Sequence, residues 1–219
     1  MTGPAPSATP GTATELLDRA IRYAVGTADG VARDLLSGPT PCRGWDLAML
    51  LEHASESVGA LCEGIQTGRL GLRPNFPESA ARRDPAKNFR NRAMDLLDAR
   101  PSNCPGSSVI DVAGRPLAVA EMACAGALEL AVHGWDISQA CGLGWPIPDD
   151  LASELLAIAP LFVPANGREP LFGPAVAAGP SPTSSERLVA FLGREPGQRP
   201  CVPSRDSANL QALLGLASD

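Results

Sequence analysis

Residues 117–141 read LAVAEMACAGALELAVHGWDISQAC, and this apolar stretch decides the fold. No proline interrupts it, so it predicts one long α-helix that is buried on most of its sides. Glu129 and His133 lie four positions apart within it. Residues at that spacing lie one turn apart on a single helix face. A carboxylate in such apolar surroundings is costly unless a partner compensates its charge, so we expect such a partner beside Glu129.

The rest of the chain is also predicted to be mainly helical. Apolar residues at helical spacing predict further helices over residues 15–36, 46–66, 85–99, 149–159, 184–192 and 210–216. Asp46 is suited to cap the second helix, and Pro85 suits the first position of the third. Val109–Val112 is the one strand-like piece. We therefore predict an all-α fold, a four-helix up-down bundle with a long crossover and a helical C-terminal extension.

The same pattern predicts one domain with two appendages. Residues 1–13 are rich in Pro, Gly, Thr, Ser and Ala, a composition typical of a disordered N-terminus. Residues 14–197 are expected to form the bundle. Residues 198–219 are expected to be a C-terminal tail.

Composition excludes several classes of partner. The net charge is −6 and no basic run is present, which argues against a nucleic-acid partner. No apolar stretch is long enough to span a membrane, and the N-terminus lacks the features of a secretory signal. Six cysteines without a CxxC pair are expected to be reduced thiols. We therefore expect a cytoplasmic protein that binds a small molecule.

The chain has only two histidines, and their positions suggest a metal site. His53 lies in the second predicted helix, flanked by Leu50, Leu51 and Ala54, so we expect it to point inward. Imidazole nitrogen and carboxylate oxygen are good zinc ligands, and three protein ligands would leave a position open for water or substrate. The alternative is a solvated Glu/His pair and an ordinary buried histidine. The residues alone leave both interpretations open.

Two motifs resemble those of a known family. Residues 40–53, TPCRGWDLAMLLEH, and residues 129–136, ELAVHGWD, resemble the signatures of the DinB-like metalloproteins. The closer resemblance is to the mycothiol-dependent maleylpyruvate isomerase N-terminal branch. Residues 171–176 followed by 187–194 are similar to the end of short members, so the resemblance spans about 15–196.

The resemblance implies a DinB-like bundle in which His53, Glu129 and His133 bind one divalent metal. Zinc is the expected ion, with Ni²⁺, Fe²⁺ or Mn²⁺ as alternatives. It also implies mycothiol as a co-substrate, because relatives use this thiol for isomerisation or for conjugation of small electrophiles. A homodimer is a further implication. The chain ends at Asp219, so we do not expect the isomerase's separate C-terminal domain, nor maleylpyruvate itself as substrate.

The sequence is compatible with three functions. The first is a thiol-dependent transferase or isomerase in which a metal-held thiolate attacks the substrate. The second is a biosynthetic tailoring enzyme (a cyclase, lyase or hydrolase) in which the metal activates water or a carbonyl. The third is a non-catalytic metal-binding stress protein.

Two carboxylates are candidates for catalysis. Glu56 lies one turn from His53 and would act as a general acid or base, unless it is simply a solvated charge. Asp136 follows His133 by about one turn and would orient its imidazole, unless it caps a local turn. Trp45 and Trp135 are expected to pack rather than bind substrate.

Overall fold

The computed structural model describes residues 12–70, 84–98, 109–164, 166, 168 and 172–197. The expected disordered segment, apart from residues 12 and 13, and the expected tail and last helix lie outside these ranges. The helices are α1 (Ala13–Ala28), the short 3₁₀ helix η1 (Arg33–Leu35), α2 (Leu47–Thr67), α4 (Pro85–Asp98), α5 (Val119–Ala140), α6 (Asp149–Phe162) and α7 (Ser184–Phe191). The mainly helical class is therefore confirmed.

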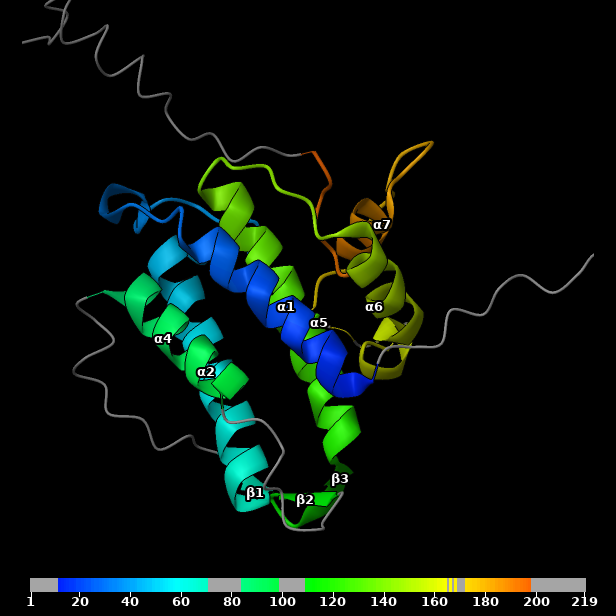
Figure 1. Cartoon of the computed structure of the whole chain (residues 1–219). Coiled ribbons are helices and arrows are strands. Elements are labelled where there is room, and N and C mark those ends of the chain that lie inside the picture. The colour runs from blue at the N-terminus through cyan, green and yellow to red at the C-terminus, as the bar shows by residue number, and fades with distance from the viewer. Residues whose placement is uncertain are drawn as a thin grey trace, which may run out of the picture.

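Helices α1, α2, α4 and α5 form the main bundle, and α6 and α7 pack together at its side (Figure 1). α1 and α5 run parallel, because Gly30 just after α1 lies against Leu143 just after α5. α2 runs antiparallel to α5, because Gly64 near the end of α2 lies against Met122 near the start of α5. The start of α2 and the C-terminal half of α5 therefore lie at the same end of the bundle.

Helix α4 starts at the same end of the bundle as α2. The Arg90 guanidinium, near the start of α4, donates a 2.8 Å hydrogen bond to the carbonyl of Ala28 at the end of α1. α4 therefore runs parallel to α2, and the bundle has an up-down-down-up order. The end of α2 and the start of α4 therefore lie at opposite ends of the bundle, which agrees with the expected long crossover.

The expectation of an all-α fold is wrong in one respect, because a small sheet closes one end of the bundle (Figure 1). Strand β2 (Val109–Val112) pairs parallel with β1 (Arg69–Leu70) and antiparallel with β3 (Arg115–Ala118). Ala113 and Gly114, both at positive φ, make the turn between β2 and β3. The sequence did not predict β3, because β3 leads directly into α5 and its last two residues were assigned to the predicted helix.

The bounds of α1 also differ from the expectation. The helix begins at Ala13, two residues before the expected start, and Thr12 caps it. The Thr12 hydroxyl accepts from the Glu15 amide at 3.3 Å, and the Glu15 carboxylate accepts from the Thr12 amide at 2.7 Å. This reciprocal pair is a capping box. The helix ends at Ala28, eight residues before the expected end, and Gly30 then packs tightly on Leu143.

Helix α5 is the centre of the core, as its sequence predicted. Fifteen of its 22 residues are buried. Gly134 permits the close approach of α1, because a Cβ at this position would meet the Ala24 Cα at 2.9 Å. Helix α1 therefore covers the face of α5 at Gly134, next to His133. The face of α5 that carries Glu129 lies toward α2. None of the described helices is both long and apolar enough to cross a membrane.

Candidate metal centre

The structure brings together the three residues proposed as metal ligands. His53 on α2 and the Glu129/His133 pair on α5 face one another across the bundle, because α2 and α5 pack antiparallel. His53 Nε2 lies 2.7 Å from Glu129 Oε1, and His133 Nε2 lies 3.1 Å from the same oxygen. All three donor atoms lie within 4.8 Å of one another.

This donor set fits a divalent transition metal. Ligand atoms about 2.0–2.2 Å from a tetrahedral zinc ion lie about 3.3–3.6 Å apart. The separations of 2.7 Å and 3.1 Å from Glu129 Oε1 are shorter, so the donor atoms would move apart by less than about 1 Å to hold the ion. Two imidazoles and one carboxylate form one of the sets that hold catalytic zinc in proteins. Imidazole also suits iron and nickel, and carboxylate suits manganese, so the donors do not select among these ions.

Trp45 holds the two imidazole rings in place. Its ring centroid lies 4.8 Å from that of His53 in an edge-to-face contact, and 6.3 Å from that of His133 in a stacked contact. The two imidazoles are nearly perpendicular, at 87°. The Asp46 cap fixes the start of α2 immediately after Trp45, since its carboxylate accepts from the Met49 amide at 2.8 Å. The packing role expected for Trp45 therefore acts on the site itself.

A second group of polar residues lies behind His133. His133 Nδ1 is 3.0 Å from Asp136 Oδ2, and the Cys42 thiol donates to the same oxygen at 3.1 Å. Arg194 donates from Nη2 to Asp136 Oδ2 at 3.0 Å and from Nε to Oδ1 at 3.4 Å. Burial raises the pKa of the Cys42 thiol against the lowering effect of His133 and Arg194. Asp136 is fully buried and contacts His133, which is the contact that an orienting role requires.

The Asp136 carboxylate determines how the His133 ring is used. An ionised carboxylate only accepts hydrogen bonds, so Nδ1 carries the proton in the 3.0 Å contact. Nε2, on the other side of the ring, carries the second proton of the charged imidazolium and donates it to Glu129 Oε1 at 3.1 Å. When that proton is lost, the Nε2 lone pair becomes free to bind a cation.

The charges in the site stabilise one another. Burial opposes ionisation of Glu129, but the charge of His133 and hydrogen bonds from both histidines hold its pKa well below the usual range. Burial likewise opposes protonation of His133, but Glu129 and the bond to Asp136 raise its pKa well above the usual value. Burial would raise the pKa of Asp136 too, yet Arg194 and His133 lower it to about 2.

Cys42, His133 and Asp136 form a second set of atoms close enough to share a metal ion. Arg194 already supplies a positive charge there, with Nη2 3.4 Å from Cys42 Sγ and 3.0 Å from Asp136 Oδ2. A cation in this second set would be repelled by the guanidinium. The charge balance therefore favours the set of His53, Glu129 and His133 as the cation site.

Three contributors were missed by the sequence reasoning. The Ser57 hydroxyl lies 3.5 Å from Glu129 Oε1, and its only sequence signal was the four-residue spacing from His53. Cys42 was treated as an inert thiol, and Arg194 is 58 residues from Asp136, so no spacing rule connects them. Glu56, the proposed acid or base, is exposed and forms no hydrogen bond or ion pair among the described residues.

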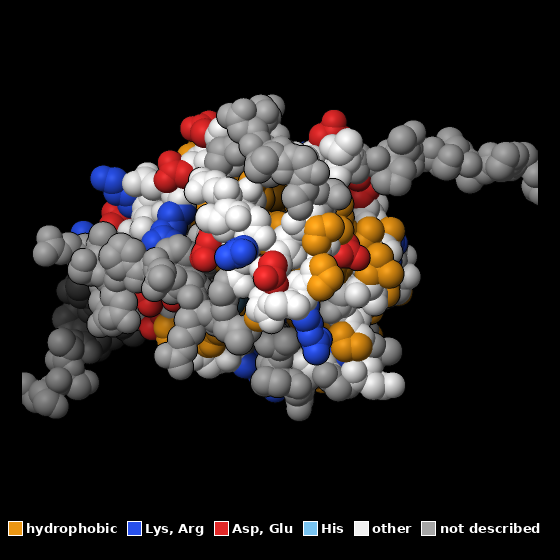
Figure 2. All heavy atoms as spheres, turned by 90° about the horizontal axis from the view of Figure 1, so that it is seen from below, with side chains coloured by type: hydrophobic (Ala, Val, Ile, Leu, Met, Phe, Trp, Pro, Cys, Tyr) orange, Lys and Arg blue, Asp and Glu red, His pale blue; other side chains and the backbone are white. Residues whose placement is uncertain are grey.

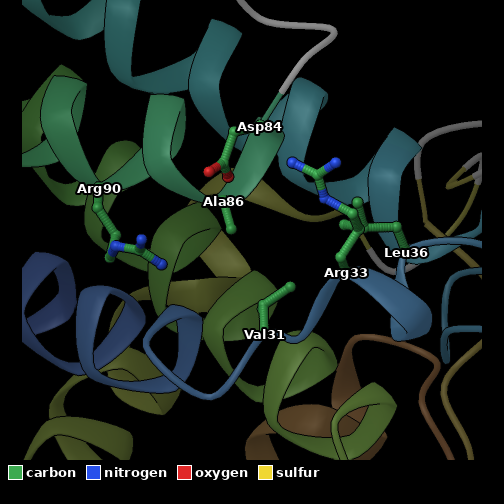
Figure 3. Close-up of a pocket in the computed structure, with 6 residues that line it drawn as sticks. All are labelled: Val31, Arg33, Leu36, Asp84, Ala86 and Arg90. Carbon is green, nitrogen blue, oxygen red and sulfur yellow. The ribbon is translucent and has the colours of Figure 1, made fainter.

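A separate pocket lies between the segment after α1 and the start of α4 (Figure 3). Its lining residues are Val31, Arg33, Leu36, Asp84, Ala86 and Arg90. Arg90 is already engaged, by a hydrogen bond to the Ala28 carbonyl and a 3.4 Å contact with Asp29. None of the proposed ligands lines this pocket, so it is not part of the candidate metal centre.

The fold and site together define a helical-bundle protein with a candidate metal centre between α2 and α5. Residues 17–138, more than half of the chain, match the family described as the mycothiol maleylpyruvate isomerase N-terminal domain. The chain therefore belongs to this family of DinB-like helical domains, and the resemblance seen in the sequence is confirmed over residues 17–138. The resemblance of residues 171–176 and 187–194 lies outside the match and stays a prediction. No curated protein and no solved structure matches the chain. The match ends at Ser138, so α6, α7 and Arg194 lie beyond it.

Proposed function

We propose that the chain is a metal-dependent enzyme that transfers a thiol to, or isomerises, a small electrophilic molecule, with mycothiol as the thiol. His53, Glu129 and His133 would hold one divalent cation, with zinc as the expected ion. The observation that carries this proposal is the convergence of three donor atoms from two helices in a family named for a mycothiol-dependent isomerase.

The exposure of the three side chains supports catalysis rather than a closed structural site. The His133 side chain is 8% exposed, whereas those of His53 and Glu129 are 37% and 31% exposed. The donor set therefore has a buried base and a rim that reaches solvent. Three protein ligands with an open side are typical of catalytic zinc, while structural zinc usually has four protein ligands. A sealed site would instead have favoured a metal-binding stress protein.

Residues around the donor set are proposed to have separate roles. When bound, a divalent cation lowers the pKa of a thiol or water that joins it and so supplies a nucleophile at neutral pH. Asp136 orients the His133 ring, and Ser57 contacts Glu129 Oε1 at 3.5 Å. Glu56 is exposed one turn after His53. We propose that it accepts a proton from the substrate or donates one to it.

The surface beside the open rim suits an apolar group on the substrate. Met49 lies one turn before His53 on α2 and is 46% exposed. Trp45 is half-buried and contacts the His53 ring. Contact with these two side chains would favour an electrophile that carries a small apolar or aromatic group. Seen from below the view of Figure 1, basic side chains lie scattered among acidic ones on the surface (Figure 2). The expected absence of a nucleic-acid partner stays a prediction.

The proposal is tested by turnover measurements on the metal-loaded protein. Purified protein at full zinc loading is incubated with a panel of epoxides, activated alkenes and alkyl halides, with and without mycothiol. We expect turnover that requires mycothiol and is lost in His133→Ala. Turnover that does not need a thiol would replace the proposal with a tailoring enzyme, and tight metal binding without any turnover would replace it with a metal-binding protein.

A further inference from the structure

The C-terminal end of α7 holds Arg194 in a fixed position. The Arg194 amide donates to the Val189 carbonyl at 2.9 Å, and the Gly193 amide donates to the Ala190 carbonyl at 3.0 Å. This pair of bonds, with Gly193 at φ 82°, is a Schellman motif that ends the helix. Gly193 also packs on the backbone of Gly173, which a Cβ would approach to 2.9 Å. The backbone at Arg194 therefore has little freedom.

The Arg194 side chain is directed into the bundle from this cap. It is 11% exposed, and it pairs with an Asp136 side chain that is fully buried. Its Nη1 donates to the Leu192 carbonyl at 3.0 Å, which leaves Nε and Nη2 to contact both oxygens of Asp136. Among the described residues, Asp136 Oδ1 receives a side-chain hydrogen bond from Arg194 alone. Without Arg194, one oxygen of a buried carboxylate would lose that partner, and the carboxylate could rotate.

We propose that Arg194 is a positioning residue of the metal centre. It holds the Asp136 carboxylate from behind, and Asp136 in turn holds His133 with Nε2 directed at Glu129 and His53. The inference rests on the proposed role of His53, Glu129 and His133 as the metal site. It assigns to α7, which lies beyond the matched part of the family domain, a share in metal affinity.

Two substitutions at Arg194 and one control test this role. Arg194→Met keeps much of the apolar length of the side chain and removes the fork of donors, whereas Arg194→Lys keeps the charge and one donor group. Arg187→Met is the matched control, because Arg187 is an exposed arginine of α7 that bonds only to the Pro182 carbonyl and the Ser184 hydroxyl among the described residues. Circular dichroism of each metal-free protein first establishes that it is folded.

The first readout is the zinc dissociation constant from competition with a chromogenic chelator. Loss of a partner behind a metal ligand weakens metal binding about 10–100-fold, so we expect about a tenfold weaker constant for Arg194→Met. Arg194→Lys should recover part of this loss, and Arg187→Met should match the wild type. Should Arg194→Met fail to fold, the comparison of Arg194→Lys with the wild type decides.

The second readout is the nitrogen NMR spectrum of histidine-labelled, zinc-loaded protein, which is simple because the chain has two histidines. We expect a protonated Nδ1 on His133 with a strong hydrogen bond, and a shift of this signal in Arg194→Met. A merely structural role would not move it. Unchanged zinc affinity and an unchanged His133 signal in a folded Arg194→Met protein would overturn the inference. Failure of the wild type to bind zinc would instead overturn the proposed function.

Discussion

His133 Nδ1 lies 3.0 Å from Asp136 Oδ2, three residues further along α5, and this contact turns the opposite ring nitrogen toward His53 and Glu129. Asp136 in turn is held by Arg194 and Cys42. The buried Asp136 carboxylate thus links the donor set on one side of His133 to the segment that follows α7 on the other side.

Asp136→Asn should weaken both the fold and the metal centre. The amide keeps the shape of the side chain but loses the charge that balances Arg194, and removing one partner of a buried ion pair costs about 3–5 kcal/mol. Zinc affinity should also fall about 10–100-fold, because the orientation of the His133 ring is no longer fixed. Urea unfolding and chelator competition measure the two effects. Asp98→Asn, at an exposed position at the end of α4, is the control and should change neither.

Removing a ligand should remove the metal. We expect His133→Ala to lose most of its bound zinc on dialysis and Glu129→Gln to bind zinc more weakly than the wild type, since an amide oxygen is a poorer ligand than a carboxylate. Elemental analysis of the dialysed proteins gives the metal content per chain. Glu63→Gln makes the same substitution on α2, outside the donor set, and should retain the full metal content. Equal metal content in all four proteins would exclude this set of ligands.

Zinc should stabilise the protein more at high pH than at low pH. In the metal-free protein the pKa of His133 is raised above 6.5, so its protonated form contributes stability that is full below pH 6.5 and is lost as the pH rises through the raised value. The pKa of Glu129 is depressed below 4.5, so its contribution is present above pH 4.5 and is lost as the pH falls through the depressed value. Both contributions are complete between pH 4.5 and pH 6.5, so the metal-free protein should be most stable in that range.

Zinc reverses this trend, because it must displace the His133 proton. Affinity should rise by about tenfold per pH unit for each proton released, until the pH exceeds the raised pKa. Thermal unfolding between pH 5 and pH 8, with and without zinc, gives the shift in Tm as a function of pH. A shift that stays constant or shrinks toward pH 8 would contradict proton–metal competition at His133.

Glu56→Gln separates catalysis from metal binding. If Glu56 acts as a general acid or base, kcat should fall about 10²–10⁴-fold, since that is the usual contribution of such a group. Zinc content should stay at the wild-type level, because Glu56 is exposed and outside the donor set. Glu63→Gln again serves as the control. An unchanged kcat would return Glu56 to the alternative of a solvated surface charge.

Gly193→Ala should lower the stability of the protein at the C-terminal end of α7. An alanine there would adopt a left-handed conformation, which costs about 1–2 kcal/mol, and its Cβ would also clash with the backbone of Gly173 at 2.9 Å. Gly179→Ala is the matched control, because Gly179 has a similar φ of 87° and open space around it. Urea unfolding should show a larger loss of stability for Gly193→Ala than for Gly179→Ala, and the difference measures the contact between Gly193 and Gly173.

Much of the site was predictable because its signals are local. The four-residue spacing of Glu129 and His133 places both on one face of a helix, whatever the rest of the chain does. The Asp46 cap set the start of α2, which was expected at Asp46 and begins at Leu47. The apolar character of α5 likewise predicted its burial, and burial is what makes an acid beside a histidine informative.

The sequence by itself therefore determined the helices that carry the donor set and the faces on which His53, Glu129 and His133 lie. Only the tertiary structure decided where α1 stops, that β3 precedes α5, and that Arg194 reaches Asp136 across 58 positions. The physical reason is range: helical periodicity and capping act within one or two turns, whereas these features depend on which distant surfaces the whole core brings into contact.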